Sequence, residues 1–533
     1  MAEQNATRDI LRDEYNAAPY HSYPFGQTHP THLHTLAKLF KLNPSAVENA
    51  RILELGCAGG GNIIPVALQF PRAEVLGIDL AEKQIEDGVK QIEHLKLNNI
   101  TLRQQSILDF EAREGKFDYI ICHGVYSWVS EAVKDKILQI CHEHLTPNGI
   151  AYVSYNTLPG WNMVNSVREL MLWHTQSIQD PMLKAQQARS VLKFLVDGLQ
   201  EDNSSYAQVL RNEINLLSKQ GDFYLLHEHL SSFNHPVYFH QFMERANRHH
   251  LSYLSDAHLL TMYTDNLPQQ FSKELSKIKN IIAVGQYMDF IRNQRFRCTL
   301  LCHDTQVVNR AINTQDVEGF YIQLLGKPDN PNFSEKDIKE GSEVSFTNGS
   351  LTIKVRSTIA QTALLILMQE QFKPIHYTEL CKKLMVKTGV KQLDVIKHHL
   401  NNDLNLMRAL FAGIININSY PGNYTLEVAK KPTVCPLARF QAQNQNHVTN
   451  RRHQTIMLDP LTKVVLPLLD GTLDTKALIE HVNTQIKEGK LSMLDEQKQP
   501  IKDEQEIVKR TKSICTTTLE NMAKQAIMVE CET

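Results

Sequence analysis

The sequence predicts an α/β protein whose first domain is a doubly wound, mostly parallel sheet. Three observations support this: strand and helix patterns alternate from Arg51 to Ser154, a glycine-rich turn (Gly56–Gly61) follows the first strand, and Asp79 ends the second. Such sheets bind ligands at the carboxyl ends of their strands. At 533 residues the chain is too long for a single core, so we expect further domains.

Apolar periodicity locates the elements of this sheet. Helices are expected over Asn62–Gln69, Lys83–Lys96 and Ser130–His144. Strands are expected at Arg51–Leu55, Glu74–Ile78, Thr101–Gln104, Phe117–Cys122 and Ile150–Ser154.

After Gly160 the pattern becomes helical over Val164–Leu217. A helix at Pro236–Asn247, an apolar run at Leu251–Leu254, a helix near Tyr287–Ile291 and a strand at Phe296–Cys302 follow. We interpret these as the last elements of the same sheet, interrupted by a helical insertion at about 163–232. The first domain then covers 1–305. A separate helical domain is the alternative.

Two further domains are expected, at 306–430 and 431–533. The first has strand signals at Val344–Phe346 and Leu351–Val355. Three helices and a two-stranded ribbon follow, in the order of a winged helix: Thr358–Gln369, Tyr377–Leu384, Gln392–Leu410, then Gly413–Asn418 with Tyr424–Ala429. Because Asp394 and Asp403 dilute the basic residues of the last helix, a role in protein contact or packing is favoured over DNA binding. The final domain reads as helical, around Leu461–Leu469 and Lys476–Thr484.

Composition and charge argue against several classes of function, nucleic-acid binding among them. A formal net charge of −2 gives no overall attraction to nucleic acid or anionic lipid. No signal peptide is visible, and no apolar run approaches the roughly 20 residues of a membrane span, which predicts a cytoplasmic protein without membrane insertion. Nine thinly spread cysteines indicate reduced thiols. Cys298 and Cys302 fit a core strand better than zinc, so no metal is expected.

The glycine-rich turn suits a nucleoside cofactor, either NAD or S-adenosylmethionine. The NAD fingerprint needs a central glycine where this chain has Ala58. Three features favour the methyl donor: Glu54 two residues before the first glycine, the crowded Gly59–Gly61, and Ser106–Asp109 after the third strand, which can hold an adenine. NAD chemistry remains the alternative.

Residues after the fourth and fifth strands should line the acceptor pocket. A lysine amine, with a pKa near 10.4 in solution, must lose its proton before it can attack; an aromatic pocket and a nearby acceptor both help. The predicted catalytic residues are His123, Trp128, Tyr155 and Asn156. His227 and Glu228 can supply a proton acceptor or form a hydrogen-bond network at a helix start. Tyr20 and Tyr23 can form a lid or a surface arm.

The motifs Glu54–Pro65, Asp79 and Ser106–Asp109 resemble those of class I S-adenosylmethionine-dependent methyltransferases, which have a Rossmann-like sheet. This resemblance implies that Glu54 and the glycine turn surround the methionine moiety, that Asp79 binds the ribose, and that Ile107–Asp109 frame the adenine. The expected cofactor-binding residues are Tyr20, Tyr23, Glu54, Gly56, Cys57, Ala58, Gly59, Asn62, Asp79, Leu80, Ser106, Ile107, Leu108, Asp109 and His123.

Further motifs narrow the family: Tyr20–Pro30, His123–Val129, Tyr155–Trp161, His227–Leu230 and Phe296–Leu301. With these, residues 15 to 305 resemble bacterial methyltransferases that carry a methyltransferase regulatory domain, among them the rickettsial-type protein lysine methyltransferases. Those enzymes modify outer-membrane proteins and are dimers. The resemblance therefore implies lysine methylation of a protein substrate, such as a surface or outer-membrane protein, by a homodimer that releases S-adenosylhomocysteine.

Two other functions remain open at this point. The chain could methylate a small molecule, or it could bind the cofactor without turnover and recruit a partner. In the protein-methylating interpretation, the domains after Asp304 grip a large substrate. Their removal should then spare cofactor binding and impair only protein methylation.

Overall fold

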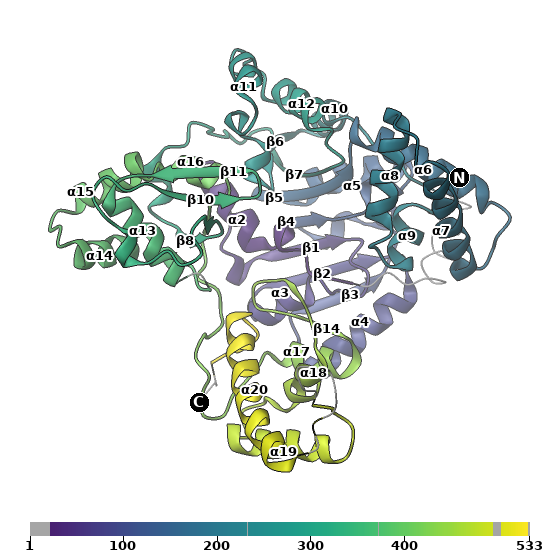
Figure 1. The fold of residues 1–533 in the computed structure, drawn as a ribbon. Coiled ribbons are helices and arrows are strands. Elements are labelled where there is room, and N and C mark those ends of the chain that lie inside the picture. Colours follow the sequence, from purple (N-terminus) through teal and green to yellow (C-terminus); the bar gives the residue numbers. More distant parts are fainter. Residues whose placement is uncertain (1–21, 232, 371, 494–500, 502, 531–533) are drawn as a thin grey trace.

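The computed structural model describes residues 22–231, 233–370, 372–493, 501 and 503–530. Its centre is a seven-stranded mixed sheet of order β3-β2-β1-β4-β5-β7-β6 (Figure 1). Strands β1 to β5 are parallel, whereas β7 is antiparallel to both of its neighbours. The strands are β1 (Arg51–Leu55), β2 (Glu74–Asp79), β3 (Ile100–Gln104), β4 (Phe117–Cys122), β5 (Leu145–Asn156), β6 (Leu251–Asp256) and β7 (Phe296–His303). The prediction that one sheet resumes after a helical insertion is confirmed.

Both faces of the sheet are buried, so neighbouring strand residues belong to different cores. Ile52 of β1 packs with α2, α3 and α4, whereas Leu53 packs with α5 and α10 on the opposite face. The order of strands reverses between β1 and β4, which is where open α/β sheets bind ligands. The helices are α2 (Pro30–Leu39), α3 (Ile64–Gln69), α4 (Glu82–Leu95), α5 (Glu131–His144), α10 (Phe239–Arg248), α11 (Gln269–Leu275) and α12 (Ile281–Arg292).

The helical insertion has an apolar core of its own, beside the sheet (Figure 1). The long helical stretch expected from the sequence is divided by capped helix starts. Asp180 accepts a hydrogen bond from the Leu183 amide, and Ser204 accepts one from the Ala207 amide. The insertion comprises α6 (Gly160–His174), α7 (Pro181–Gly198), α8 (Ser205–Leu217) and α9 (Asp222–Glu228).

The middle domain packs four helices against small sheets around a separate core. The helices are α13 (Thr358–Gln369), α14 (Tyr377–Thr388), α15 (Leu393–His398) and α16 (Leu406–Phe411). The sheets are β9 (Lys327–Pro328) with β10 (Val344–Asn348) and β11 (Leu351–Val355), and β8 (Tyr321–Leu324) with β12 (Ile375–His376) and β13 (Ile415–Asn418).

Two predictions for the middle domain are wrong. The ribbon of Gly413–Asn418 with Tyr424–Ala429 does not form, because β13 pairs with β8 instead and Tyr424 turns away to donate a hydrogen bond to the Phe372 carbonyl. The helix expected over Gln392–Leu410 is interrupted, because Asn405 adopts a left-handed conformation and caps α16.

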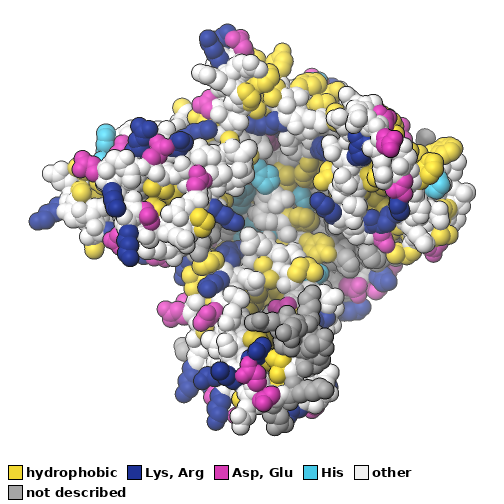
Figure 2. Space-filling model, in the orientation of Figure 1, with side chains coloured by type: hydrophobic (Ala, Val, Ile, Leu, Met, Phe, Trp, Pro, Cys, Tyr) yellow, Lys and Arg dark blue, Asp and Glu magenta, His cyan; other side chains and the backbone are white. Residues whose placement is uncertain are grey.

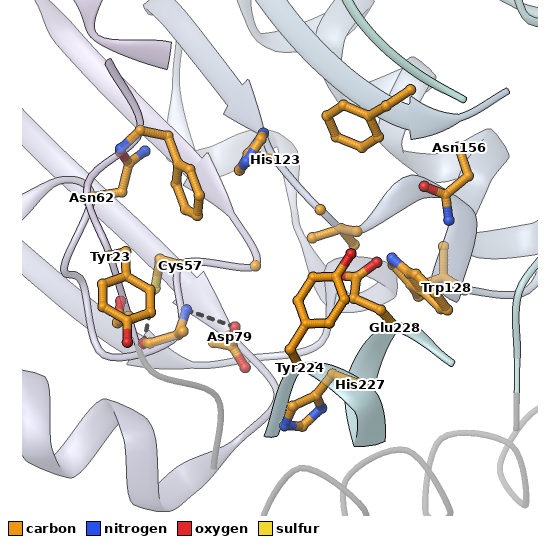
Figure 3. Close-up of a pocket in the computed structure, with 18 of the residues that line it drawn as sticks. Tyr23, Cys57, Asn62, Asp79, His123, Trp128, Asn156, Tyr224, His227 and Glu228 are labelled. Atoms are coloured by element: carbon orange, nitrogen blue, oxygen red, sulfur yellow. Dashed lines mark hydrogen bonds between the residues drawn. The ribbon is translucent and has the colours of Figure 1, made fainter. Parts of the chain in front are cut away.

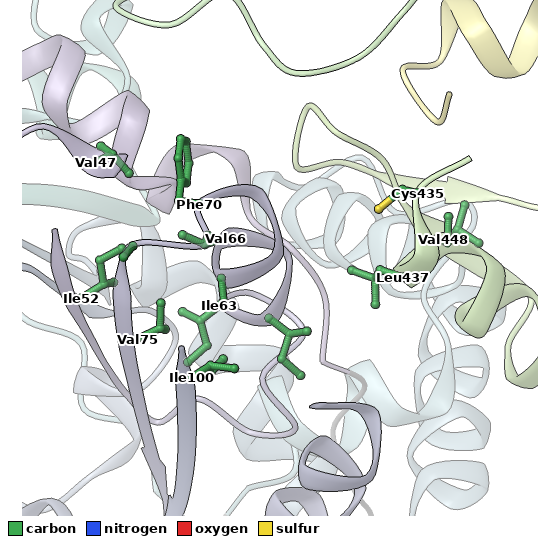
Figure 4. Packing of buried hydrophobic residues seen from close by; sticks show 14 of the residues in the cluster. Val47, Ile52, Ile63, Val66, Phe70, Val75, Ile100, Cys435, Leu437 and Val448 are labelled. Carbon is green, nitrogen blue, oxygen red and sulfur yellow. The ribbon is translucent and has the colours of Figure 1, made fainter. Parts of the chain in front are cut away.

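The C-terminal domain shares a core with the sheet domain. Leu437 and Val448 belong to the same buried cluster as Ile52 and Val66, and Figure 4 shows them on the two sides of that cluster. This domain contains α17 (Pro436–Asn444), β14 (His447–Thr449), β15 (Thr455–Met457), α18 (Pro460–Val465), α19 (Thr475–Lys487) and α20 (Glu504–Lys524). Within the described part of the chain, no helix is long and apolar enough to cross a membrane.

Candidate active site

A cavity of about 570 Å³ lies at the carboxyl ends of β1, β2, β4 and β5. Side chains from the sheet, from the segment before α2 and from α8 and α9 line it. Figure 2 shows the molecule hollowed over the sheet, with histidine and hydrophobic side chains inside. The lining residues fall into a sheet end around Asp79 and an insertion end around Glu228 (Figure 3).

The turn after β1 brings backbone against the cavity where no side chain fits. Gly56 has a φ of +78°, and a Cβ there would lie 2.4 Å from the Val125 side chain. A Cβ on Gly61 would lie 2.2 Å from the Ser22 carbonyl oxygen. These positions therefore require glycine, and they form a cradle for a closely held ligand.

Two carboxylates lie beside this cradle. Asp79, at the end of β2, accepts hydrogen bonds from the amides of Ala58 (2.8 Å) and Ala81 (2.9 Å), yet burial still raises its pKa. Each oxygen retains acceptor capacity, which suits the hydroxyl groups of a ribose.

Glu54 is 3% exposed and is only half satisfied. Its Oε1 accepts a hydrogen bond from Asn62 Nδ2 at 2.7 Å, whereas Oε2 is buried without a partner among the described residues. Burial raises the Glu54 pKa to about 8, against the opposing effect of Asn62 and with a smaller contribution from Asp79. A bound cation would favour the charged form of this buried carboxyl group, and the methionine part of S-adenosylmethionine carries an ammonium group. The residues present therefore fit this cofactor.

The segment after β3 supplies the apolar side of the sheet end. Ser106, Ile107 and Leu108 line the cavity, and Ser106 Oγ accepts a hydrogen bond from the Leu108 amide. Leu108 is 37% exposed although it is apolar, which leaves a face for a flat ring such as adenine.

His123 lies between the two ends of the cavity (Figure 3). Its Nδ1 is 3.0 Å from both Tyr152 Oη and Ser154 Oγ, and its ring centroid is 4.1 Å from that of Phe25. Burial lowers the His123 pKa to about 4. The ring is therefore neutral near pH 7, and it packs as an uncharged wall.

The insertion end combines aromatic rings with one carboxylate. Trp128 packs edge-on against Trp161, and Tyr224 and Glu228 of α9 face Trp128 across the cavity (Figure 3). No described residue forms a hydrogen bond or ion pair with the Glu228 carboxylate, and burial raises its pKa to about 7. Asn156 Nδ2 donates to Asn234 Oδ1 at 3.0 Å, which holds the buried Asn156 amide in the cavity lining.

The structure gathers most of the predicted site residues around this cavity. Gly59 and Asp109 lie outside its lining, and Tyr20 lies outside the described residues. The residues in the lining are Tyr23, Glu54, Gly56, Cys57, Ala58, Asn62, Asp79, Leu80, Ser106, Ile107, Leu108, His123, Trp128 and Asn156.

Tyr155 is a correction to the predicted catalytic set. It is 1% exposed, stacks on Phe242 of α10 with ring centroids 4.2 Å apart, and lies 3.0 Å from Thr299 Oγ1. Strand alternation turns Tyr155 towards the face that α10 covers, so it belongs to the core rather than to the cavity.

Several lining residues were not predicted as site residues, although Phe25, Val125 and Phe296 lie within the motifs of the sequence. Phe25 and Val125 enter through short loops, Tyr224 through the insertion, and Arg295 and Phe296 at the start of β7. Arg295 forms an ion pair with Glu213 of α8 and so joins the insertion to the sheet. Only the assembled fold brings them together.

A doubly wound sheet with this cradle, the paired carboxylates and the apolar ring site defines a class I S-adenosylmethionine-dependent methyltransferase. Family models agree along the chain: a methyltransferase domain matches residues 46–194, a predicted methyltransferase regulatory domain 221–303, and the C-terminal winged helix domain of PKMT 430–527. The winged-helix match falls on the domain for which the sequence predicts only helices.

Similar proteins extend over nearly the whole chain. Protein RP789 of Rickettsia prowazekii is 40% identical over 97% of this chain and 93% of its own length. Protein RP028 of the same organism is 48% identical over 44% of this chain and 94% of its own. The structure of PKMT2 from Rickettsia typhi in complex with AdoHcy has a TM-score of 0.87 and 36% identity, covering 96% of this chain and all of that one. The chain belongs to the rickettsial PKMT-type family of methyltransferases, and its methyl donor is S-adenosylmethionine.

Proposed function

We propose that the protein methylates lysine side chains of a protein substrate. The observation that carries this proposal is the insertion end of the cavity, where Glu228 lies in an aromatic wall without a hydrogen bond or ion pair to any described residue. Such a wall accepts an aliphatic amine, and a carboxylate with a pKa near 7 can take a proton from it. The PKMT names of the matching domain and of the similar structure support the same substrate class.

The residues then have separate roles. The bound donor supplies an activated methyl group on a sulfonium. Glu54 and the glycine turn hold its amino-acid part, Asp79 its ribose, and Leu108 its adenine. Trp128 and Tyr224 hold the lysine stem, and the loss of water in this apolar pocket disfavours the charged form of the amine. Glu228 takes the proton of the amine, whose nitrogen then forms the bond to carbon as the carbon–sulfur bond breaks. Positioning in line accounts for much of the rate.

The test uses methyl-labelled donor and a cell lysate separated into proteins and small solutes. We expect label in proteins, on lysine nitrogens located by mass spectrometry. Label confined to small solutes would identify a small-molecule methyltransferase, and binding of S-adenosylhomocysteine without any transfer would identify a protein without turnover.

Glu228→Gln tests the proposed proton acceptor. It should bind S-adenosylhomocysteine with unchanged affinity and transfer methyl groups to the labelled proteins at least tenfold more slowly at pH 7. Glu244→Gln, an exposed change on α10, is the matched control. Equal rates in the two variants would remove Glu228 from the mechanism.

We also propose that the protein is a homodimer that pairs through its insertion, and that the domains at 306–430 and 431–533 help to hold the substrate. The insertion exposes large apolar side chains, including Trp173 (69% exposed) and Phe194 (73%). Light scattering should give twice the chain mass, and Phe194→Glu should reduce it. A wild-type monomer would contradict the proposal.

A further inference from the structure

The C-terminal domain reaches the cofactor cradle through one side chain. His453 lies in the turn between β14 and β15, is 4% exposed, and has its Nε2 2.8 Å from Asn62 Oδ1. Asn62 in turn donates from Nδ2 to Glu54 Oε1 at 2.7 Å. Three residues from two domains therefore form a continuous hydrogen-bonded path. It ends at Glu54, whose Oε2 is buried without a hydrogen bond to any residue that the structure describes.

The direction of each hydrogen bond in this path is fixed. The backbone amide of Phe25 can only donate, and it does so to Asn62 Oδ1 at 3.0 Å. The oxygen of Asn62 therefore points towards His453, and its amide nitrogen points towards Glu54. Since Asn62 Oδ1 accepts, His453 Nε2 carries a hydrogen. Burial keeps the His453 pKa well below its ordinary value, so the ring is a neutral donor.

The turn that carries His453 is built to hold it. His453 has a φ of +59°, which is strained for a residue with a side chain. Asn450 stabilises this turn: its Oδ1 accepts from the amides of Arg452 and Gln454, and its Nδ2 donates to the Gln525 carbonyl after α20. The imidazole is thus anchored to the body of the C-terminal domain.

The same domain contacts the segment in front of the glycine turn. The Tyr23 ring lies 4.9 Å from that of His447, and the His29 ring lies 4.7 Å from that of His453. Ser22 Oγ accepts a hydrogen bond from the Gly61 amide at 2.7 Å. Segment 22–29 is therefore held between the cradle and the C-terminal domain.

We propose that His453 is a positioning residue of the donor site, which acts through Asn62 to orient the Glu54 carboxylate towards the ammonium group of S-adenosylmethionine. The C-terminal domain then completes the donor site. This differs from the expectation that removing the chain after Asp304 spares cofactor binding. The inference rests on the assignment of Glu54 to the donor and is independent of which acceptor is methylated.

The test is calorimetric titration of the full-length protein with S-adenosylhomocysteine between pH 6.5 and 9. His453→Leu keeps the volume but cannot donate, and should weaken binding about tenfold. His453→Gln retains a donor nitrogen and should recover most of the affinity. Val448→Ala, a buried change in the same domain that does not touch Asn62, is the control for lost stability.

The pH dependence separates positioning from general destabilisation. The hydrogen bond from Asn62 lowers the Glu54 pKa, and without His453 this amide is held less firmly against Glu54. The pH midpoint of binding should therefore move upward in His453→Leu and stay unchanged in Val448→Ala. The other titratable groups facing Glu54 are Asp79, Cys57 and Cys122, and burial raises the pKa of both thiols well above 9.

Each outcome has a distinct meaning. Wild-type affinity and midpoint in His453→Leu would overturn this inference, as would an effect no larger than that of Val448→Ala. A wild-type protein that does not bind S-adenosylhomocysteine would instead overturn the donor-site assignment itself.

Discussion

Glu54 serves ligand binding at the expense of stability. Burial raises its pKa from 4.5 to about 8, so the native state holds this proton to higher pH than the unfolded state. The free energy of unfolding must therefore fall as the pH rises from about 4.5 to 8, by roughly 3 kcal/mol at pH 7. A bound ammonium group removes this cost, because it favours the charged carboxylate.

Glu54→Gln tests this account. The amide stays neutral and can still accept from Asn62, so the ligand-free variant should be as stable as wild type near pH 4.5 and more stable at pH 8.5. Urea unfolding at the two pH values measures the difference, and calorimetry should show weaker binding of S-adenosylhomocysteine. Parallel pH dependence in both proteins would contradict the raised pKa of Glu54.

At the same scale, the sequence identifies residues that follow a strand directly. Asp79 at the end of β2, and Ser106 and His123 just after β3 and β4, were placed at the cavity this way, because the carboxyl ends of parallel strands meet at one edge. Glu54 lies within β1 and was located from its position before the glycine-rich turn. His453 could not be found, since 391 positions separate it from Asn62 and no local pattern encodes their contact. Tyr155 was wrongly assigned to the cavity, because the face to which a side chain near a strand end points depends on where strand pairing stops.

Among the elements, the turn after β1 depends on its fit against the loop after β4. Gly56→Ala should destabilise the protein by about 1–3 kcal/mol, because its Cβ would overlap Val125 in a backbone conformation that alanine resists. Gly124→Ala has a similar φ of +69° with nothing within 4 Å, so it should cost less. Denaturant midpoints measure both.

Adding Val125→Ala to Gly56→Ala isolates the overlap. The double variant should be more stable than the sum of the two single changes predicts, because shortening Val125 makes room for the new methyl group. Strict additivity would show that backbone strain alone sets the cost at Gly56.

The last strands of the sheet are joined to α12 by a buried ionic cluster. Arg297 of β7 is 6% exposed, contacts Asp256 of β6 at 2.7 Å and Asp289 of α12 at 2.9 Å, and stacks over Phe239. Arg297→Met should cost about 3–5 kcal/mol, since it leaves two buried carboxylates without their partner. Arg103→Met removes an exposed pair with Glu114 and should cost under about 1 kcal/mol. Equal shifts in unfolding midpoint would contradict the ranking.

Elements were predicted best where periodicity is local. The five parallel strands and their helices form where expected, with β5 beginning at Leu145 rather than Ile150, because their apolar residues recur at local strand or helix spacing. The ribbon of the middle domain failed because its partner strand, β8, lies about 90 residues earlier in the chain. Helix α20 was not predicted, because its sequence is mostly polar and its apolar residues form only a narrow stripe.

In the whole molecule, the division of the cores predicts which domains respond to ligand. The C-terminal domain shares one buried cluster with the sheet domain, whereas the middle domain has its own. The middle domain is joined to the sheet domain through Leu39 of α2, which enters the buried cluster of the middle domain, and through polar contacts. These include His34 Nδ1 to Ser419 Oγ at 2.8 Å and Tyr420 Oη to Glu48 at 2.8 Å. Binding of a donor analogue should therefore stabilise the C-terminal domain together with the sheet domain and leave the stability of the middle domain unchanged.

Hydrogen exchange with and without S-adenosylhomocysteine tests this division. A ligand at a hundred times its Kd stabilises the unit that it binds by about 2.7 kcal/mol. Amides of β1, α3 and α17 should gain protection together, because opening any of them exposes the shared cluster. Amides of α13 and α14 should change little, since their core can open without disturbing the cradle. Protection of α13 equal to that of α17 would mean that the three domains open as one unit. Hydrogen exchange in α17 that does not change with the ligand would mean that the C-terminal domain is not coupled to the donor site.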